Sequence, residues 1–420
     1  MDAAPENDQL RSRSLAPLRW LALAAALAVA QPARAAGDLG FKIGEAGRLH
    51  LRLEIDGQYD SNVFYSQAGA PVGGYLVDII PGFELQVTGN ENSLSLKGNL
   101  DVKQYLSEEA KDLSKVFGDA SLAATLNRNG AVGVELTDTF AHSDQTPSLS
   151  VAQAVISNHN DLRLAVPIRP GGGALDLTLS GQWVRETFEE YVTSTGCDPV
   201  ANPTCVPANI PGYGYNQYGG AAEARWRFLP KTALTLNLDY FQRTPDDETL
   251  SLPVNGLRIY GGLAGLVTPR VAVTLKAGWG TAFDSPGFDW STWLGLAEVQ
   301  YVTQGPVGAK LGYLHDFRAD PGTDYSLYEL NRVYADGKIL LGGRLTIRAT
   351  LSWDGVEYVI NGVKSSIFTF APAVDYELMR WIYVGATYTI TSRTSSGLAA
   401  PVPAFDYTRQ LIGLRVVFAY

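Results

Sequence analysis

The last fifteen residues of the chain, 406–420, alternate between two kinds of side chain. Every second residue counted back from the C-terminal Tyr420 is apolar as far as Ile412, and small or charged residues such as Gly413 and Arg415 lie between them. Successive side chains of a β-strand point to opposite faces. The segment therefore predicts a strand with one face toward lipid and the other toward water.

The same segment resembles the C-terminal signal by which bacterial outer-membrane barrels are recognised for insertion. The residues that carry the resemblance are Leu414, Val416, Phe418 and Tyr420. The resemblance implies a location in the bacterial cell outer membrane, among lipid and lipopolysaccharide. It also implies that the barrel-insertion machinery is a partner of this chain.

The amino end predicts export from the cytoplasm. Three arginines, Arg11, Arg13 and Arg19, precede the apolar run 20–30, and small residues at A-x-A spacing follow. This order is typical of a secretory signal peptide. An apolar run this short cannot cross about 30 Å of hydrocarbon as a helix. We expect residues 1–35 to be cleaved as a signal peptide and residues 36–47 to form a short periplasmic N-terminal segment.

Alternation of the same kind recurs along most of the chain. It is unbroken in 48–59, and it returns in 94–102, 175–183, 234–240 and 345–353. A period of two over about ten residues predicts a two-faced strand. The chain holds no apolar run long enough for a membrane helix, so strands must span the membrane.

The breaks between these strands are of two kinds, which alternate. The eight tight breaks fall at 89–92, 127–130, 170–173, 229–231, 268–270, 304–307, 341–344 and 379–381. The nine long polar breaks fall near 60–74, 106–115, 141–156, 188–214, 243–255, 284–290, 318–324, 355–366 and 393–405. This pattern predicts an all-β fold, a transmembrane antiparallel up-and-down β-barrel of about eighteen strands over residues 48–420, with sixteen as the alternative.

Two further features of the barrel follow from particular residue types. Pro81 and Pro372 fall within predicted strands, where proline removes a ladder hydrogen bond, so we expect bulges or kinks there. Aromatic residues cluster toward strand ends, which predicts two girdles at the membrane interfaces.

If the apolar register faces lipid, the other register faces a lumen, which eighteen strands would leave wet. Charged residues of both signs occupy that second register. The candidates for lining the lumen are Arg52, Glu54, Asp56, Lys97, Asp101, Asp176, Glu223, Arg225, Asp239, Lys276, Arg348 and Arg415. Wet positions tolerate charge, and opposed charges also set the selectivity of a pore, so both interpretations stay open.

The only two cysteines, Cys197 and Cys205, lie in the long break 188–214. In an exported protein this spacing predicts a local disulfide. That break either folds into the pore or covers it from outside. A metal site is the alternative for the two cysteines, but no histidine lies near them in the sequence.

No motif of catalysis or cofactor binding occurs. The triplet His142-Ser143-Asp144 holds the residue types of a nucleophilic triad, but adjacent residues rarely present the required geometry. Nothing in the sequence predicts an enzyme, a metal site or a cofactor. The net charge of −10 argues against nucleic acid as a partner.

Residues 57–64, Gly-Gln-Tyr-Asp-Ser-Asn-Val-Phe, end the first long predicted strand. They resemble a signature at the same place in the porin 2 type family of β-barrel outer-membrane proteins. Several members are encoded with exopolysaccharide synthesis and export machinery. Taken by itself, the stretch Asp60-Ser61-Asn62 also predicts a turn at the outer rim.

This resemblance implies a passive outer-membrane conduit for exopolysaccharide export or surface assembly, with a periplasmic polysaccharide-export protein as a partner. Two alternatives stay open. One is a general diffusion porin for small solutes, and the other is a structural or adhesive barrel that acts through its surface loops.

Overall fold

The computed structural model describes residues 40–66, 71–145, 155–190, 210–285, 288–302, 305–321, 327–397 and 406–420. In these residues, nineteen strands form one antiparallel sheet. The strands are β1 (Phe41–Ile43), β2 (Gly47–Asp60), β3 (Gly74–Thr88), β4 (Ser93–Tyr105), β5 (Lys115–Leu126), β6 (Val134–Gln145), β7 (Val155–Ile168), β8 (Leu175–Glu190), β9 (Tyr215–Leu229), β10 (Thr232–Pro245), β11 (Val254–Thr268), β12 (Val271–Ser285), β13 (Phe288–Tyr301), β14 (Val307–Ala319), β15 (Leu327–Leu341), β16 (Leu345–Tyr358), β17 (Lys364–Met379), β18 (Ile382–Ser396) and β19 (Tyr407–Ala419). Within the described ranges, three short 3-10 helices accompany them: η2 (Glu108–Leu113), η3 (Pro170–Gly172) and η4 (Ile210–Tyr213).

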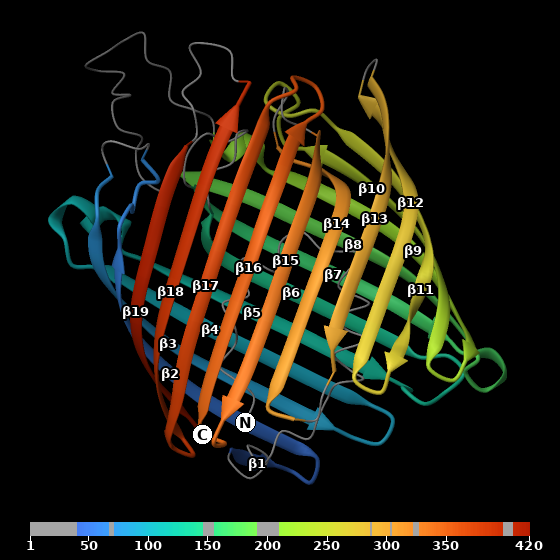
Figure 1. Cartoon of the computed structure of the whole chain (residues 1–420), viewed down its shortest axis with the longest axis horizontal. Helices are drawn as coiled ribbons and strands as arrows, with labels where there is room; N and C mark the ends of the chain where they lie inside the picture. Colours follow the sequence, from blue (N-terminus) through green and yellow to red (C-terminus); the bar gives the residue numbers. More distant parts are fainter. Residues whose placement is uncertain are drawn as a thin grey trace.

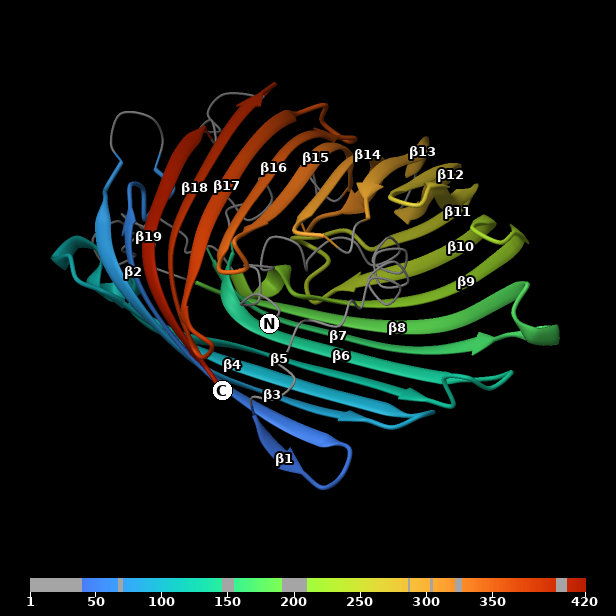
Figure 2. The same ribbon diagram turned by 60° about the horizontal axis from the view of Figure 1, so that its bottom comes forward.

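The sheet closes on itself as a barrel. Each strand from β2 to β18 pairs with the next, and β19 pairs with β2 from Leu411↔Asp60 to Ala419↔Arg52. The closed wall therefore has 18 strands, β2–β19, as the sequence predicted. Figure 2 shows β3–β8 on one side of the wall and β15–β19 on the other.

The connections between strands follow the predicted alternation of short and long with one exception. The break near 284–290 was predicted to be long, but only two residues separate the end of β12 at Ser285 from the start of β13 at Phe288. All eight predicted tight turns join paired strands, from the turn between β3 and β4 to the turn between β17 and β18. The C-terminus lies at the end of the barrel that carries these turns, beside β1 (Figure 1). We call this end the turn side and the opposite end the loop side.

The two faces of the wall differ as the alternation predicted. In β2, the apolar residues Leu51 and Ile55 are 44% and 40% exposed. The acidic residues on either side of Ile55, Glu54 and Asp56, are only 6% and 7% exposed. An apolar exterior that alternates with a polar interior is the arrangement of a barrel in lipid. Among the described residues no helix is long and apolar enough to cross a membrane.

Exposed aromatic side chains gather in two zones of the outer surface. Those nearer the loop side are Tyr59, Tyr240, Trp279 and Trp353, and those nearer the turn side are Trp226, Phe228, Tyr376, Trp381 and Tyr420. Amphipathic rings of this kind favour the boundary between hydrocarbon and headgroups. The two zones bound the band of the wall that faces hydrocarbon.

The expected bulges at Pro81 and Pro372 are wrong. Pro81 stays in register with Leu53 of β2, and the pairing of β3 with β4 lapses beside it without a shift of register. Pro372 likewise stays in register with Ala349, and the pairing of β17 with β18 lapses on its other side. Proline lacks only its backbone N–H, so hydrogen bonds to one neighbouring strand are interrupted locally while the strand itself continues.

The wall is only half-paired between β13 and β14. Their pairing runs from Tyr301↔Ala309 to Gly295↔His315, and toward the loop side the two strands separate. The tip of β14 instead packs on other strands. The ring of Phe317 on β14 lies 6.2 Å from the ring of Phe241 on β10, measured between ring centres. Phe317 is fully buried with Leu294 and Tyr260 in one apolar cluster. Phe317 therefore anchors the tip of β14 against the inner face of β10–β13.

Part of the expected N-terminal segment belongs to the sheet. β1 pairs with β2 from Phe41↔Leu49 to Ile43↔Gly47, on the same edge of β2 that β19 occupies further along. The rings of Phe41 and Tyr420 lie 5.0 Å apart. The expected signal peptide, 1–35, lies outside the described residues.

Candidate functional site

The inner face of the barrel is identified by contacts that span several strands. Arg258 of β11 donates from Nη2 to the carbonyl oxygen of Phe317 at 2.8 Å and lies 3.2 Å from Asp316, both on β14. Such contacts are possible only across the concave side of the wall. Arg258 and every second residue of β11 counted from it therefore point into the barrel. On the other strands, the residues paired with these in the ladders point inward as well.

Most candidate lumen residues occupy that inward register, and several meet in networks. Arg415 of β19 bridges Asp375 of β17 at 2.7 Å and Glu54 of β2 at 3.5 Å. Arg348 of β16 also pairs with Asp375, and Arg52 pairs with Glu54. This network links β2, β16, β17 and β19 across the point where the barrel closes.

Other candidates are spread around the wall. Asp239 accepts a hydrogen bond from Arg258 at 3.0 Å, and Asp176 accepts one from Arg227 at 2.6 Å. Lys97 lies 2.9 Å from Glu84, its neighbour on β3, and remains half-exposed. The structure does not bring these residues together with the Arg415 network, so the candidates form several groups and no single cluster.

Three further candidates, Asp56, Asp101 and Lys276, lie on two facing arcs of the inner wall whose charged groups form no ion pair among the described residues. Asp56 and Asp78 are directly opposite each other on β2 and β3, and Gln58 Nε2 donates to both at 2.9 and 3.0 Å. Asp101 follows on β4. Each of these three carboxylates has a buried oxygen for which the described residues supply no hydrogen-bond partner. We call Asp56, Asp78 and Asp101 the acidic arc.

Cations lie across the barrel from the acidic arc. In a ring of 18 strands, β11–β14 lie nine strands away from β2–β5. Lys276 of β12 donates only to the neutral Asn237, at 2.7 Å, among the bonds of the described residues. Arg318 of β14 is 8% exposed, and its Nε and Nη2 find no hydrogen-bond partner there. Facing arcs of opposite charge create a field across the interior.

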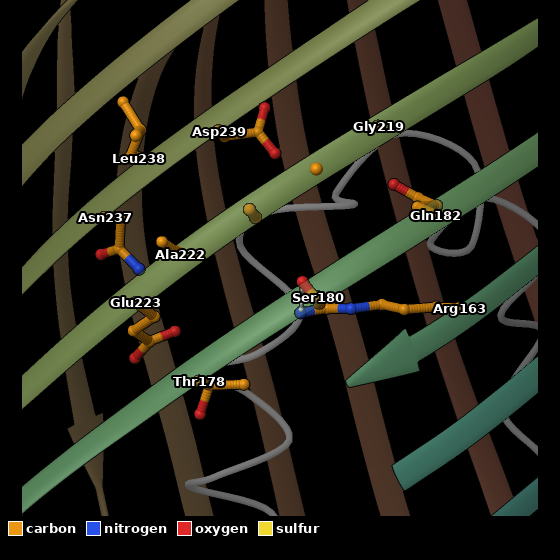
Figure 3. A pocket seen from close by; sticks show the side chains of 12 residues that line it. Arg163, Thr178, Ser180, Gln182, Gly219, Ala222, Glu223, Asn237, Leu238 and Asp239 are labelled. Carbon is orange, nitrogen blue, oxygen red and sulfur yellow. Dashed lines mark hydrogen bonds between the residues drawn. The ribbon is translucent and has the colours of Figure 1, made fainter. Parts of the chain in front are cut away.

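A recess lies in the inner wall between the two arcs. It is formed by β7–β10, where Gly219 and Ala221 leave its floor without bulky side chains (Figure 3). The space that it shares with the adjoining interior is about 470 Å³. Arg163 reaches over the floor from one side and donates from Nη2 to Ser180 Oγ at 2.8 Å. Glu223 stands on the other side of Ser180.

The stretch 57–64 forms a buried network at the loop-side rim, which we call the clasp. Asp60 is fully buried and accepts hydrogen bonds from Arg409 Nε at 2.9 Å and Nη2 at 2.6 Å. Its other oxygen accepts from the backbone N–H of Asn62 at 2.9 Å. The Arg409 guanidinium lies over the Tyr65 ring, 4.6 Å from its centre. The expected turn at Asp60-Ser61-Asn62 therefore also joins the first barrel strand to the last.

Sequence reasoning missed several residues of these networks. Arg258, Arg409 and Asp78 were not among the candidates, although each lies in the inward register of its strand. Alternation alone would have found Asp78 and Arg409. It would not have found Arg258, because β11 carries four glycines, Gly256, Gly261, Gly262 and Gly265, that blur its period.

The remaining expectations concern cysteine and catalytic chemistry. Cys197 and Cys205 lie outside the described residues, as does most of the break 188–214. In β6, His142 Nδ1 lies 2.7 Å from Asn158 Oδ1. Within the described ranges no group of three or more histidine, cysteine, aspartate or glutamate side chains is placed to hold a metal ion.

Comparisons with known proteins give structural neighbours only. No protein-family model matches the chain, and no curated protein matches it. Among solved structures, OccK3 of Pseudomonas aeruginosa is similar at 11% identity and a TM-score of 0.45, over 89% of this chain and 95% of that one. OccAB3 of Acinetobacter baumannii is similar at 10% identity and 0.46, over 89% and 99%. The copper transporter OprC is similar at 10% identity and 0.43, over 85% of this chain but only 63% of its own.

The strand pairing and the two-faced wall define the class of protein. A closed antiparallel barrel with an apolar outer band and aromatic zones at both ends is a transmembrane barrel. The protein is therefore a β-barrel that spans a membrane with its eighteen closed strands.

Proposed function

We propose that the protein is a passive channel that lets small hydrophilic solutes diffuse through the outer membrane. The observation that supports this proposal most directly is the pair of facing arcs. Asp56 and Asp78 on one wall and Lys276 and Arg318 on the other form no ion pair among the described residues, and Asp56, Asp78 and Arg318 also keep buried polar atoms without a hydrogen-bond partner there. Buried ions that lack an ion pair are costly in a dry interior, whereas water in a lumen would solvate them. An interior of this size exceeds what side chains fill.

The candidate lumen residues therefore line water in this proposal. Solutes would cross down their own gradient, because no nucleotide site occurs in the sequence. The acidic arc gives the channel a preference for cations, because its three carboxylates outnumber Lys276 and Arg318 on the facing wall and raise the local concentration of the opposite ion.

Reconstitution in planar lipid bilayers tests the proposal. We expect stable single-channel steps in KCl and a reversal potential in a KCl gradient that reports cation preference. If neither the native chain nor a variant without residues 191–209 conducts, the channel function is refuted. The structural or adhesive alternative would then be tested by loop-dependent binding to cells.

Exopolysaccharide export is the second candidate, and only the likeness of residues 57–64 to the porin 2 type family favours it. In this case a periplasmic polysaccharide-export protein would dock on the turn side. Deletion of the gene tests it: loss of surface polysaccharide, restored by the native gene, is the expected result, and unchanged polysaccharide contradicts it.

A further inference from the structure

We infer that the outer wall at β6 and β7 is an interface with a second copy of this chain, centred on Asp138 and Asn160. The contact forms within the plane of the membrane. This inference does not depend on the channel function, because its observable is the number of chains in the folded assembly.

Asp138 points away from the lumen. The ladder rows that start at Arg258 of β11 lead across β10, β9, β8 and β7 to Glu135 of β6, which therefore points into the barrel. Side chains alternate along a strand, so Leu136, Asp138 and Phe140 share the outer face of β6. The ring of Phe140 is 43% exposed on that face.

The carboxylate of Asp138 lies in an apolar setting. Its neighbours on the same face of β6 are Leu136 and Phe140, and its partners in the two adjoining ladders are Leu122 of β5 and Leu162 of β7. Among the outward-facing charged residues that the structure describes, Asp138 alone has four apolar neighbours of this kind. Ionisable side chains within a membrane almost always face protein or water, because lipid solvates them poorly. The position therefore indicates that protein covers this part of the wall.

One hydrogen bond satisfies Asp138 only in part. Asn160, on the same outer face, donates from Nδ2 to Asp138 Oδ1 at 3.0 Å. No cation pairs with Asp138 among the described residues. A carboxamide carries two N–H donors, and a carboxylate accepts up to about four hydrogen bonds. One N–H of Asn160 and most of the capacity of Asp138 therefore remain available to a neighbouring protein.

A second copy supplies the complementary groups. Two chains related by a two-fold axis along the membrane normal present the same wall to each other. With the axis between β6 and β7, Asp138 of each copy lies opposite Asn160 of the other, so each Asn160 can donate one N–H within its chain and one across the axis. On the outer face of β5, the small residues Ala120 and Ala124 flank Leu122 and let a second wall come close.

The charges of this wall disfavour a lipid headgroup as the occupant. Closer to the loop side, Asn158 of β7 donates to Glu189 at 3.1 Å, so a second carboxylate lies above Asp138 on the outer face. The arginine of the same region, Arg185, is engaged by Asp246 through two hydrogen bonds. An anionic phosphate would therefore meet carboxylates without a free cation.

Cross-linking through an introduced cysteine tests the interface in lipid vesicles. Leu162→Cys places a thiol beside Asp138. The matched control is Leu351→Cys, at an outer apolar position that is 42% exposed on β16, nine strands away around the barrel. Both variants also carry Cys197→Ser and Cys205→Ser, so that no other thiol reacts.

We expect a short bifunctional maleimide to join two chains through Leu162→Cys, seen as a band of twice the mass, and not through Leu351→Cys. Adding Asp138→Leu and Asn160→Leu to Leu162→Cys should raise the protein-to-lipid ratio for half-maximal cross-linking about tenfold, the size expected for two hydrogen bonds between membrane segments. The folded barrel should still migrate faster than the heated one on gels, which shows that the leucines act on association and leave the fold intact.

Three results overturn the inference. One is equal cross-linking through Leu162→Cys and Leu351→Cys, which reports random collision. Another is association that Asp138→Leu with Asn160→Leu leaves unchanged in the folded barrel. The third is the absence of a cross-link through Leu162→Cys together with the mass of a single chain for the native protein in native mass spectrometry.

Discussion

Replacing Arg409 by methionine should strongly destabilise the barrel, because it leaves the carboxylate of Asp60 buried without its cation. Asp60 is 0% exposed and accepts two of its hydrogen bonds from Arg409. A hydrogen bond to a charged group contributes about 1.5–3 kcal/mol, and breaking a buried pair costs about 3–5 kcal/mol. We therefore expect the free energy of unfolding of Arg409→Met to fall by about 4 kcal/mol.

The assay is urea unfolding of the barrel in lipid vesicles, followed by tryptophan fluorescence. With a slope of about 3 kcal/mol per molar urea, the midpoint should fall by more than about 1 M. The control Lys97→Met removes a half-exposed pair with Glu84, and it should cost no more than about 1 kcal/mol.

A double variant isolates the cause. Asp60→Asn combined with Arg409→Met removes the buried charge together with its partner, so it should recover at least half of the stability that Arg409→Met loses. If Arg409→Met unfolds at the same midpoint as Lys97→Met, or if the double variant recovers nothing, the clasp does not act through the buried ion pair.

Three further predictions concern the seam between β13 and β14, the outer surface and the pore. Gly280→Val should destabilise the barrel by about 1–3 kcal/mol, because a β-carbon there would lie 2.5 Å from the Phe317 ring; Phe317→Ala in the same chain should relieve the strain, and urea midpoints that show no relief would contradict this packing. Leu414→Lys places a charge on a side chain that is 71% exposed on the outer face, and should cost about 1–3 kcal/mol, seen as a smaller folded, heat-modifiable band on gels. Asp56→Asn with Asp78→Asn should move the reversal potential in a KCl gradient toward anion preference, and an unchanged potential would remove the acidic arc from the basis of selectivity.

The architecture was predictable because its signal is local. In β16, Leu345, Ile347, Leu351 and Trp353 alternate with polar residues, and the observed strand spans Leu345–Tyr358. The tight turns fell where the alternation broke, so strand count and order followed. The register of the alternation also indicated which charged residues point inward.

The partners of those inward residues were not predictable, because they depend on which strands face each other in space. Asp60 and Arg409 are 349 residues apart in the sequence. The position of the tip of β14 was also not predictable. Asp316 and Phe317 interrupt the alternation there, because Asp316 pairs with Arg258 and Phe317 packs on Phe241, both on other strands. The bulges predicted at Pro81 and Pro372 failed for a related reason. The sequence does not show which neighbouring strand loses a hydrogen bond to each proline.

The uneven pairing around the barrel is consistent with the entropy of closing it. Joining β19 to β2 closes a loop of about 350 residues, whereas β13 and β14 first pair at Tyr301↔Ala309, 8 residues apart in the sequence. Loop-closure entropy makes the first contact cost about 3 kcal/mol more than the second. The long closure carries three reinforcements: the clasp at the loop side, the Arg415 network in the middle, and the mutual backbone bonds of Leu51 and Tyr420 beside β1.

The seam between β13 and β14 needs no such reinforcement, because the turn between the two strands already holds them together. Its loop-side half can therefore separate and let Phe317 pack inside. This reasoning predicts that disrupting the clasp lowers the yield of closed barrels on refolding far more than Phe317→Ala does. Equal refolding yields of Arg409→Met and Phe317→Ala, measured by the heat-modifiable band, would show that closure is not where this fold concentrates its stabilising contacts.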